Sequence, residues 1–463
     1  MRTRRSYMRT KKELQQLDEK YLFHPVVQLK EHQQKGARII VEGDGTRIKD
    51  IDGREYIDAF SSLWNVIIGH GQKQVQKAIT EQLGKLEYYS PFFGFASPPA
   101  IELAAKVVSL MPKEWNMGHV MFTCGGSETN DTNMKFARMY WACKGKDSKK
   151  KIISRNYAYH GVTFGALTAT GIEFFKTNFD PLPPGFLHIM APYCYRCELG
   201  LTYPECGIGC AKQLEEAILR EGPDTIAAFI AEPVMGTGGV IIPPKEYWPM
   251  IRGICDKYEV LILADEVITG FGRTGKMFGC MNWDLRPDLI SVAKGITSGY
   301  FPTGGAIASN EIFDTIRDNI PSFLPFLHGF TYNNHPVGCA AGLANIKIIE
   351  DEKLVENAAT VGAYMHDRLK GLYDLKSVGD IRAIGLMAAV ELVKDKQTKE
   401  PIGELPMEGT HRVEELMWEK GIYARAMMEN VAVAPPLTVT KKEIDLIVDA
   451  LESSIVKMEK EML

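Results

Sequence analysis

Residues 261–305 read LILADEVITGFGRTGKMFGCMNWDLRPDLISVAKGITSGYFPTGG, and this stretch decides the fold of the chain. Two short apolar runs belong to it, Val260–Ala264 and Leu289–Ala293, and a charged residue follows each run. Apolar runs of this length, bounded by turn residues, predict buried strands of an α/β sheet. Because functional groups of such sheets gather at the carboxyl ends of the strands, Asp265 and Lys294 are expected to share one site.

A lysine and an aspartate at neighbouring strand ends fit pyridoxal phosphate chemistry. The amine of Lys294 would form a Schiff base with the cofactor aldehyde, and after release it would carry a proton between substrate and cofactor carbons. The carboxylate of Asp265 would keep the ring nitrogen protonated by opposite-charge stabilisation. Taken singly, the two residues would be interpreted as a surface lysine and a helix cap, but the flanking sequence favours the catalytic interpretation.

The segment resembles the signature of class III pyridoxal phosphate aminotransferases, the ω-aminotransferases, and the resemblance covers nearly the whole chain. It implies an α/β protein of fold type I, with a large domain around a mainly parallel sheet of the seven-stranded type and a small α+β domain made from both chain ends. We therefore expect an N-terminal arm at 1–35, small-domain segments at 36–75 and 336–463, and a large cofactor-binding domain at 76–335.

Small residues at the start of a predicted helix indicate a phosphate site. Cys124-Gly125-Gly126-Ser127 follows an apolar strand and enters a long helix predicted over 130–143, at whose start backbone N–H groups and the helix dipole attract anions. Gly126 and Ser127 match the family's phosphate contact, although many relatives carry Asn-Ser or Ser-Ser in place of Cys124-Gly125. By the same resemblance Thr331 reaches the phosphate of the neighbouring subunit, which implies a homodimer with shared active sites and leaves a tetramer open.

Four further residues are placed beside the cofactor by resemblance. Tyr159 would stack on one face of the ring and Val267 would pack on the other, which suits a flat ring held between two apolar surfaces. His160 follows Tyr159 in the same motif, and Glu232 corresponds to a family glutamate near the cofactor. A core tyrosine is the alternative interpretation of Tyr159.

Three residues are predicted to contact the substrate. By resemblance Leu63 and Trp64 line the pocket, although a tryptophan after a strand is more often a core residue. Arg425 lies ten positions before Pro435, in the register of an arginine that swings in to bind a substrate carboxylate. A planar guanidinium suits this task because it binds a carboxylate through two parallel hydrogen bonds. A surface salt bridge remains an equal alternative for Arg425.

One motif points to a different class of enzyme. Gly270–Gly275 fits the GxGxxG pattern and follows a strand, as in dinucleotide-binding proteins. Such a site also needs a helix opening there and an acidic residue at the end of the next strand. Residues 276–283 lack a clear helical pattern and the next strand ends at Lys294, so we interpret the motif as a turn-rich loop rather than an oxidoreductase site.

Composition narrows the partners. The 463 residues are 45% hydrophobic and carry 54 basic against 58 acidic side chains, a net charge of -4, so a nucleic-acid partner is not expected. No apolar stretch approaches the roughly 18 residues of a membrane span. The basic residues among the first twelve lack an apolar segment behind them and are interpreted as a frayed arm rather than a targeting signal. We expect a cytoplasmic protein.

Nine cysteines suit a reducing compartment, but four of them are grouped at positions 194, 197, 206 and 210. The spacing of Cys194, Cys197, Cys206 and Cys210 is compatible with a tetrahedral metal site, a pair of disulfides or a surface insertion with free thiols. We assign no metal to the protein and leave the state of this loop open.

The predicted activity is a ping-pong transamination. A small ω-amine or ω-amino acid, taurine-like or β-alanine-like, would give its amino group to the cofactor, and an α-keto acid, pyruvate, would accept it. The alternatives inside the fold are an ornithine- or 4-aminobutyrate-type enzyme that uses 2-oxoglutarate, and a decarboxylating or mutase relative. Outside the class, a dinucleotide oxidoreductase and a non-catalytic protein with a metal-binding cysteine loop are less favoured.

Overall fold

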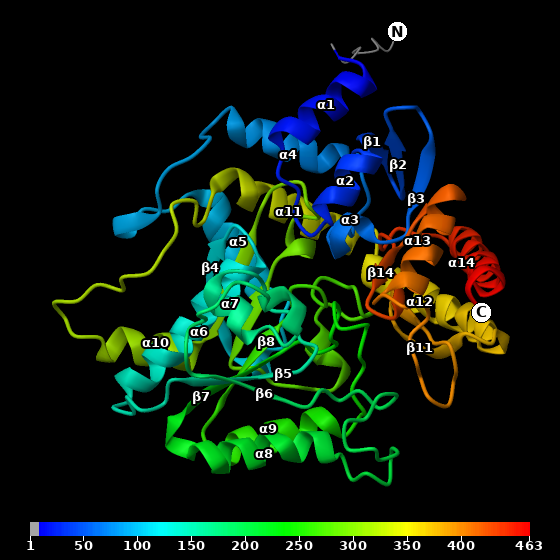
Figure 1. Ribbon diagram of the computed structural model, residues 1–463. Helices are drawn as coiled ribbons and strands as arrows, with labels where there is room; N and C mark the ends of the chain where they lie inside the picture. The colour runs from blue at the N-terminus through cyan, green and yellow to red at the C-terminus, as the bar shows by residue number, and fades with distance from the viewer. Residues whose placement is uncertain (1–8) are drawn as a thin grey trace.

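The computed structural model describes residues 9–463, and a seven-stranded sheet forms its centre (Figure 1). The strands are β4 (Met117–Thr123), β5 (Lys151–Arg155), β6 (Phe186–Ile189), β7 (Ile226–Ala231), β8 (Leu261–Asp265), β9 (Leu289–Val292) and β10 (Gly304–Ser309). Their order is β4-β10-β9-β8-β7-β5-β6, and β10 is antiparallel to both of its neighbours while the other pairs are parallel. The predicted mainly parallel sheet is confirmed.

Helices cover both faces of this sheet, which is why β7, β8 and β9 are apolar at nearly every position and buried throughout. The helices of this region are α4 (Lys73–Leu83), α5 (Pro98–Ser109), α6 (Gly126–Cys143), α7 (Phe164–Ala169), α8 (Gly209–Glu221), α9 (Tyr247–Lys257), α10 (Asn310–Asn319) and α11 (Pro336–Asp351), of which α4 packs on α11 rather than on the sheet. Figure 1 places α8 and α9 together on the far side of the sheet from α6 and α7. The long helix predicted from Asn130 begins four residues earlier, at Gly126.

Two small sheets join the ends of the chain. The first contains β1 (Ile40–Asp44), β2 (Arg47–Asp50), β3 (Glu55–Asp58) and β13 (Ile422–Tyr423); the second contains β11 (Val378–Ile384), β12 (Met387–Leu392), β14 (Arg425–Met427) and β15 (Asn430–Val433). The parallel pairing of β13 with β3 ties the C-terminal region to the N-terminal hairpins. Both ends therefore build one unit, as the predicted small domain requires, while its boundaries at 36–75 and 336–463 stay a prediction.

Three C-terminal helices, α12 (Leu354–Lys370), α13 (Glu408–Glu419) and α14 (Lys441–Met462), gather beside the N-terminal hairpins at the edge of the molecule (Figure 1). Gly421, just past the end of α13, adopts a φ of 80°, a left-handed conformation that suits the end of a helix. No helix in residues 9–463 is long and apolar enough to cross a membrane.

The N-terminal arm consists of α1 (Lys11–Tyr21) and α2 (Leu29–Lys35). Lys11 pairs with Asp52 at 2.5 Å and Lys35 pairs with Glu415 at 2.9 Å, so both helices contact the small sheets and their helices. Half of the basic residues among the first twelve, Arg2, Arg4 and Arg5, lie outside the described residues, whereas Arg9, Lys11 and Lys12 are placed.

A short irregular segment follows β3. Residues Ser61–Trp64 form α3, but Ser61, Ser62 and Trp64 have φ values of 49°, 59° and 64°, which are unfavourable for residues with a Cβ. Strain of this kind is held in place by surrounding contacts and is frequent at functional sites. Here it turns consecutive side chains toward different parts of the molecule.

The glycine motif at 270–275 is a turn-rich loop, as predicted. The buried carboxylate of Glu266 accepts backbone hydrogen bonds from Gly279 and Cys280, each at 2.8 Å, and so folds the loop back on the end of β8. The chain continues through turns to residue 278 rather than opening a helix at Gly275. It therefore lacks the helix start on which a dinucleotide would place its pyrophosphate.

Candidate active site

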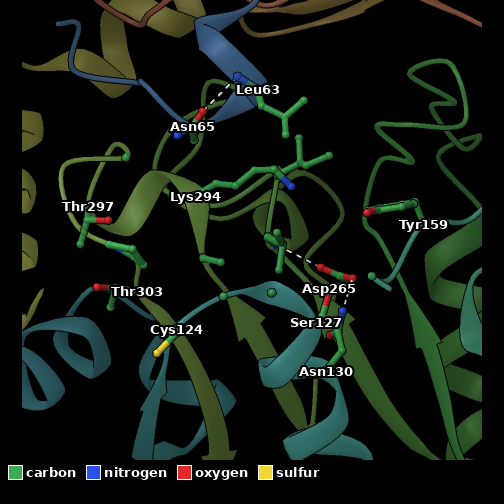
Figure 2. A pocket seen from close by; sticks show the side chains of 18 of the residues that line it. Leu63, Asn65, Cys124, Ser127, Asn130, Tyr159, Asp265, Lys294, Thr297 and Thr303 are labelled. Atoms are coloured by element: carbon green, nitrogen blue, oxygen red, sulfur yellow. Dashed lines mark hydrogen bonds between the residues drawn. The ribbon is translucent and has the colours of Figure 1, made fainter. Parts of the chain in front are cut away.

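A cavity of about 460 Å³ lies at the carboxyl ends of β8 and β9, within the size range of small-ligand sites. Figure 2 shows the side chains that face it, with Lys294 extended between Leu63 on one side and Asp265 on the other. All of the predicted site residues line this cavity except Trp64, Thr331 and Arg425. Residues from six separate stretches of the chain therefore meet where the sheet topology predicts a site.

The carboxylate of Asp265 is held by three donors. Its Oδ2 accepts hydrogen bonds from Asn130 Nδ2 and His160 Nδ1, both at 2.8 Å, and its Oδ1 accepts one from the Val267 backbone N–H at 3.1 Å. Asp265 is only 3% exposed, so its orientation is fixed. A carboxylate in this position can stabilise a protonated aromatic nitrogen that enters the cavity.

Asn130 was missed by the sequence analysis. It lies one turn into α6, and its amide donates to both Asp265 and the backbone carbonyl of His160. An asparagine inside a predicted helix carries no local sign of such a role. The only available signal was its place one helical turn after Gly126-Ser127.

Lys294 follows β9 in a left-handed backbone conformation, with φ of 40°, which turns its side chain into the cavity. Its ammonium makes no hydrogen bond with any residue in the described part of the chain. Burial lowers the pKa of Lys294, and the nearby carboxylates of Asp265 and Glu232 partly oppose this effect. The result is an amine that loses its proton more readily than an ordinary lysine, as a nucleophile and base requires.

The start of α6 forms the opposite end of the cavity. Gly125 precedes the helix without a capping side chain, so N–H groups of the first turn remain available to an anion. The hydroxyl oxygen of Ser127 accepts a hydrogen bond from the Val162 N–H at 3.1 Å, which fixes its position beside them. A Cβ on Gly126 would approach Val267 to 3.0 Å, so a glycine keeps the cradle open.

The walls of the cavity are Tyr159 and Val267. Glu232 positions the tyrosine: its Oε1 accepts the Tyr159 N–H at 3.1 Å and its Oε2 accepts the Gly236 N–H at 2.8 Å. Burial raises the pKa of Glu232, while His160 opposes the shift. Glu232 thus lies beside the site and orients its wall through the backbone.

Three predicted residues lie elsewhere. Trp64 is 2% exposed and packs on Phe60, with ring centroids 4.7 Å apart, because the irregular backbone of α3 turns Leu63 and not Trp64 toward the cavity. Trp64 thus takes a core position in this structure, and its role in the pocket stays a prediction. Thr331 is exposed in a loop, and its carbonyl accepts from Tyr88 OH.

Arg425 does not line the cavity in this structure. Its Nη1 lies 3.8 Å from Glu414 Oε1, and its side chain is 34% exposed. The long separation and the exposure describe a weak ion pair that a substrate carboxylate can replace. The position satisfies the salt-bridge interpretation and leaves the swinging role untested.

The residues present fit pyridoxal phosphate. The uncapped start of α6 suits a phosphate, two apolar walls suit a flat ring, the fixed carboxylate of Asp265 suits a protonated ring nitrogen, and Lys294 offers an amine with a lowered pKa. Each group occupies a different part of one cavity, so the four requirements are met together.

The family model for aminotransferase class-III matches residues 29–455. The chain is 40% identical over 459 residues to diaminobutyrate–2-oxoglutarate transaminase of Halomonas elongata, with 97% of each chain covered. It is also 40% identical over 435 residues to putrescine–pyruvate aminotransferase of Pseudomonas aeruginosa, with 94% of each covered.

Solved structures are similar over the same length. An (S)-enantioselective ω-transaminase from Thermomicrobium roseum superposes with a TM-score of 0.93 at 43% identity, covering 98% of this chain and 100% of that one. The ω-transaminase of Pseudomonas jessenii in complex with PMP gives a TM-score of 0.94 at 39% identity, covering 97% and 99%.

Proposed function

The chain belongs to the class III aminotransferase family, and we propose that it transfers the amino group of a small ω-amine or ω-amino acid to pyruvate. Aminotransferases of this class use pyridoxal phosphate, and a similar structure holds the aminated form of that cofactor. The transaminase class follows from the family; the donor and the acceptor are the proposal.

The roles of the residues follow from their positions. Bound pyridoxal phosphate supplies an electron sink and stores the amino group between the two half-reactions. Lys294 would hold the cofactor through its amine and, when free, would take the proton from the substrate carbon that bears nitrogen. Asp265 would keep the ring nitrogen protonated, since Asn130 and His160 fix the position of its carboxylate.

The proposal that pyruvate is the acceptor rests on the charge of the residues that line the cavity. Lys294 is the only lysine or arginine among the lining residues that the structure describes. A dicarboxylate such as 2-oxoglutarate needs a cation for each of its two carboxylates. Arg425, which lies outside the lining, is the residue proposed to supply one of them, and pyruvate needs only one. The cavity therefore favours a monocarboxylate acceptor.

The same arginine supports an ω-amino acid donor of the taurine or β-alanine type. During the first half-reaction Arg425 would leave its weak pair with Glu414 and bind the acidic group at the far end of the donor. The relatives divide on this point, because one acts on putrescine with pyruvate and another on diaminobutyrate with 2-oxoglutarate. An enzyme of the 2-oxoglutarate type is the second candidate on this ground.

We also propose a cytoplasmic homodimer with shared active sites. Large apolar side chains are unusually exposed on neighbouring segments, including Phe93 at 97%, Phe323 at 86% and Leu327 at 76%. Patches of this kind mark protein interfaces. Thr331 lies in the loop after Leu327, so a partner at this surface would bring its own Thr331 toward the phosphate end of the site. Nine unpaired cysteines suit a reducing compartment.

A matrix of donors and acceptors tests the proposed substrates. Taurine, β-alanine, 4-aminobutyrate, putrescine and ornithine are each combined with pyruvate and with 2-oxoglutarate, and product amino acids are quantified. We expect alanine formation to be fastest with an ω-amino acid. Turnover only with 2-oxoglutarate would refute pyruvate as the acceptor, and turnover led by putrescine would refute an ω-amino acid donor in favour of a plain ω-amine, while the transaminase class would stand in both cases.

A further inference from the structure

Three metal-ligating side chains converge in the N-terminal arm, away from the cofactor cavity. Asp18 lies on α1, His32 lies on α2, and His24 lies in the loop between the two helices. His24 Nε2 is 2.7 Å from Asp18 Oδ1, and His32 Nε2 is 2.9 Å from Asp18 Oδ2. The two imidazole rings face each other with centroids 4.1 Å apart. One carboxylate is thus bracketed by two imidazoles.

We propose that Asp18, His24 and His32 bind a zinc-type divalent cation. One ligand atom from each residue lies within 4.8 Å of the other two. Imidazole nitrogen and carboxylate oxygen are ligands that Zn²⁺ and neighbouring first-row cations prefer. An ion about 2.1 Å from each ligand sets the ligand atoms about 3.4 Å apart in tetrahedral geometry. The His24–Asp18 and His32–Asp18 separations, now 2.7 and 2.9 Å, would therefore widen by a fraction of an ångström to admit it.

The side chains are sheltered enough for a defined site and open enough for entry. Their exposed fractions are 13% for Asp18, 23% for His24 and 17% for His32. The ion replaces the protons that now lie between each imidazole and the carboxylate. Three protein ligands leave a fourth position to water.

The structure places this site in the arm and not in the cysteine loop, where the sequence spacing suggested one. Cys194, Cys197, Cys206 and Cys210 all line one small cavity. Within residues 9–463, however, the aspartate and two histidines of the arm are the one group of three or more such ligand atoms within 4.8 Å of one another.

A bound ion would cross-link the arm to itself. The cluster joins α1 to α2, and each helix is tied separately to the body by the pairs Lys11–Asp52 and Lys35–Glu415. Without the ion, two hydrogen bonds to one carboxylate close the turn between them. The bound cation would act as a staple, a cross-link between α1 and α2, and would hold exposed residues of the connecting loop such as Phe23 and Val26 in one conformation.

Equilibrium dialysis with Zn²⁺ alone tests the site on the cofactor-loaded enzyme after removal of metal with a chelator. The background is a variant in which the four loop cysteines are serine, so thiolates cannot compete. We expect one ion per chain, with affinity at least about 100-fold lower in His32→Ala and in Asp18→Asn, which keeps the shape of the side chain but removes its charge. His366→Ala, on α12, is the matched control and should bind as the parent does.

Two results would overturn the proposal. Zinc binding that is as tight in His32→Ala as in its cysteine-to-serine background places the ion elsewhere. Zinc binding that occurs in the unmodified enzyme but is lost in that background assigns the ion to the cysteine loop. Trypsin gives a second readout, because Lys20 and Lys30 lie between Asp18 and His32, within the segment that the ion would cross-link. Zn²⁺ should slow cleavage at these lysines at least about fivefold in the parent and leave the cleavage rate of Asp18→Asn unchanged. Equal cleavage rates with and without the ion in the parent would contradict the proposed cross-link.

Discussion

Two lysines, one buried and one half-buried, lie at opposite ends of the central sheet and differ in what surrounds them. Lys149, 1% exposed, lies near the amino ends of β7 and β8, where its ammonium donates to the carbonyls of Pro223, Ile226, Tyr258 and Glu259 at 2.8–3.2 Å. Lys294 lies at the carboxyl end of β9, faces a cavity, and has only the charges of Asp265 and Glu232 nearby.

Burial lowers the pKa of both lysines, so the pKa alone does not distinguish them. The hydrogen bonds of the two amines distinguish them. Four carbonyls satisfy Lys149 and make it part of the framework, whereas the unsatisfied amine of Lys294 is available for chemistry. Lys149 therefore stabilises one end of the sheet, whereas Lys294 is available for chemistry at the other end. This division between a stabilising lysine and a reactive lysine can be tested.

The largest effect is expected from Lys294→Ala. This change removes both the attachment of the cofactor and the proton carrier, so kcat should fall by at least about 10³-fold. Because the framework does not use this amine, the free energy of unfolding should change little. Steady-state transamination and denaturant unfolding measure the two quantities; activity near that of the parent would refute the assignment of Lys294.

Asp265→Asn should be the next most damaging. The amide keeps the shape but cannot stabilise a protonated ring nitrogen, so kcat should fall by about 10²–10³-fold, the usual effect of losing one fixed electrostatic group. Asp284→Asn, an exposed residue in the turn before β9, is the control. A similar small loss in both variants would remove Asp265 from the mechanism.

Lys149→Met tests the other end of the sheet. Four carbonyls lose their charged donor, and we expect the free energy of unfolding to fall by about 3 kcal/mol. The folded fraction should keep the kcat of the parent. Lys150→Met, at the exposed neighbouring position, should change stability by less than about 0.5 kcal/mol. A loss of kcat without a loss of stability would reverse the proposed division.

Arg425→Ala probes the substrate side of the Lys294 region. If the guanidinium binds the far carboxylate of a donor, KM for β-alanine should rise by about tenfold while KM for a plain amine stays the same, because one charged hydrogen bond contributes about 1.5–3 kcal/mol. Comparing the two donors in one variant removes any general effect on folding. Equal changes for both donors would leave Arg425 as a surface salt bridge.

The smallest effect concerns pH. Because burial lowers the pKa of Lys294 below its usual 10.5, the unfolded chain binds one more proton than the folded chain between these values, so the stability of the cofactor-free enzyme rises with pH across that window. Lys294→Met lacks this group. Its stability advantage over the parent should be greatest at neutral pH and shrink toward pH 10.5. Melting temperatures check this; an advantage that grows with pH would contradict it.

Much of the framework was predictable because its signals are local. The apolar runs of β7, β8 and β9 specify strands that are buried on both faces, and the strand ends then locate Asp265 and Lys294. The start of α6 was placed four residues late, because Gly126-Ser127 has the composition of a turn. In the fold it is a helix start with an uncapped first turn.

The rest depends on contacts between distant segments. Asn130 serves the site only because α6 packs across β8, which brings its amide to Asp265. Trp64 and Leu63 are adjacent in sequence, and only the unusual backbone of α3 decides which one faces the cavity. The cluster in the arm likewise joins residues from two helices and a loop, with no recognisable motif.

The most direct test of the division between the two lysines is borohydride reduction of the cofactor-loaded enzyme. Reduction attaches the cofactor permanently to the lysine that holds it, and mass spectrometry then identifies the modified peptide. The account predicts a single modification at Lys294 and none at Lys149. A modification at Lys149 or at any other lysine, or no modification in an enzyme that still transaminates, would contradict it.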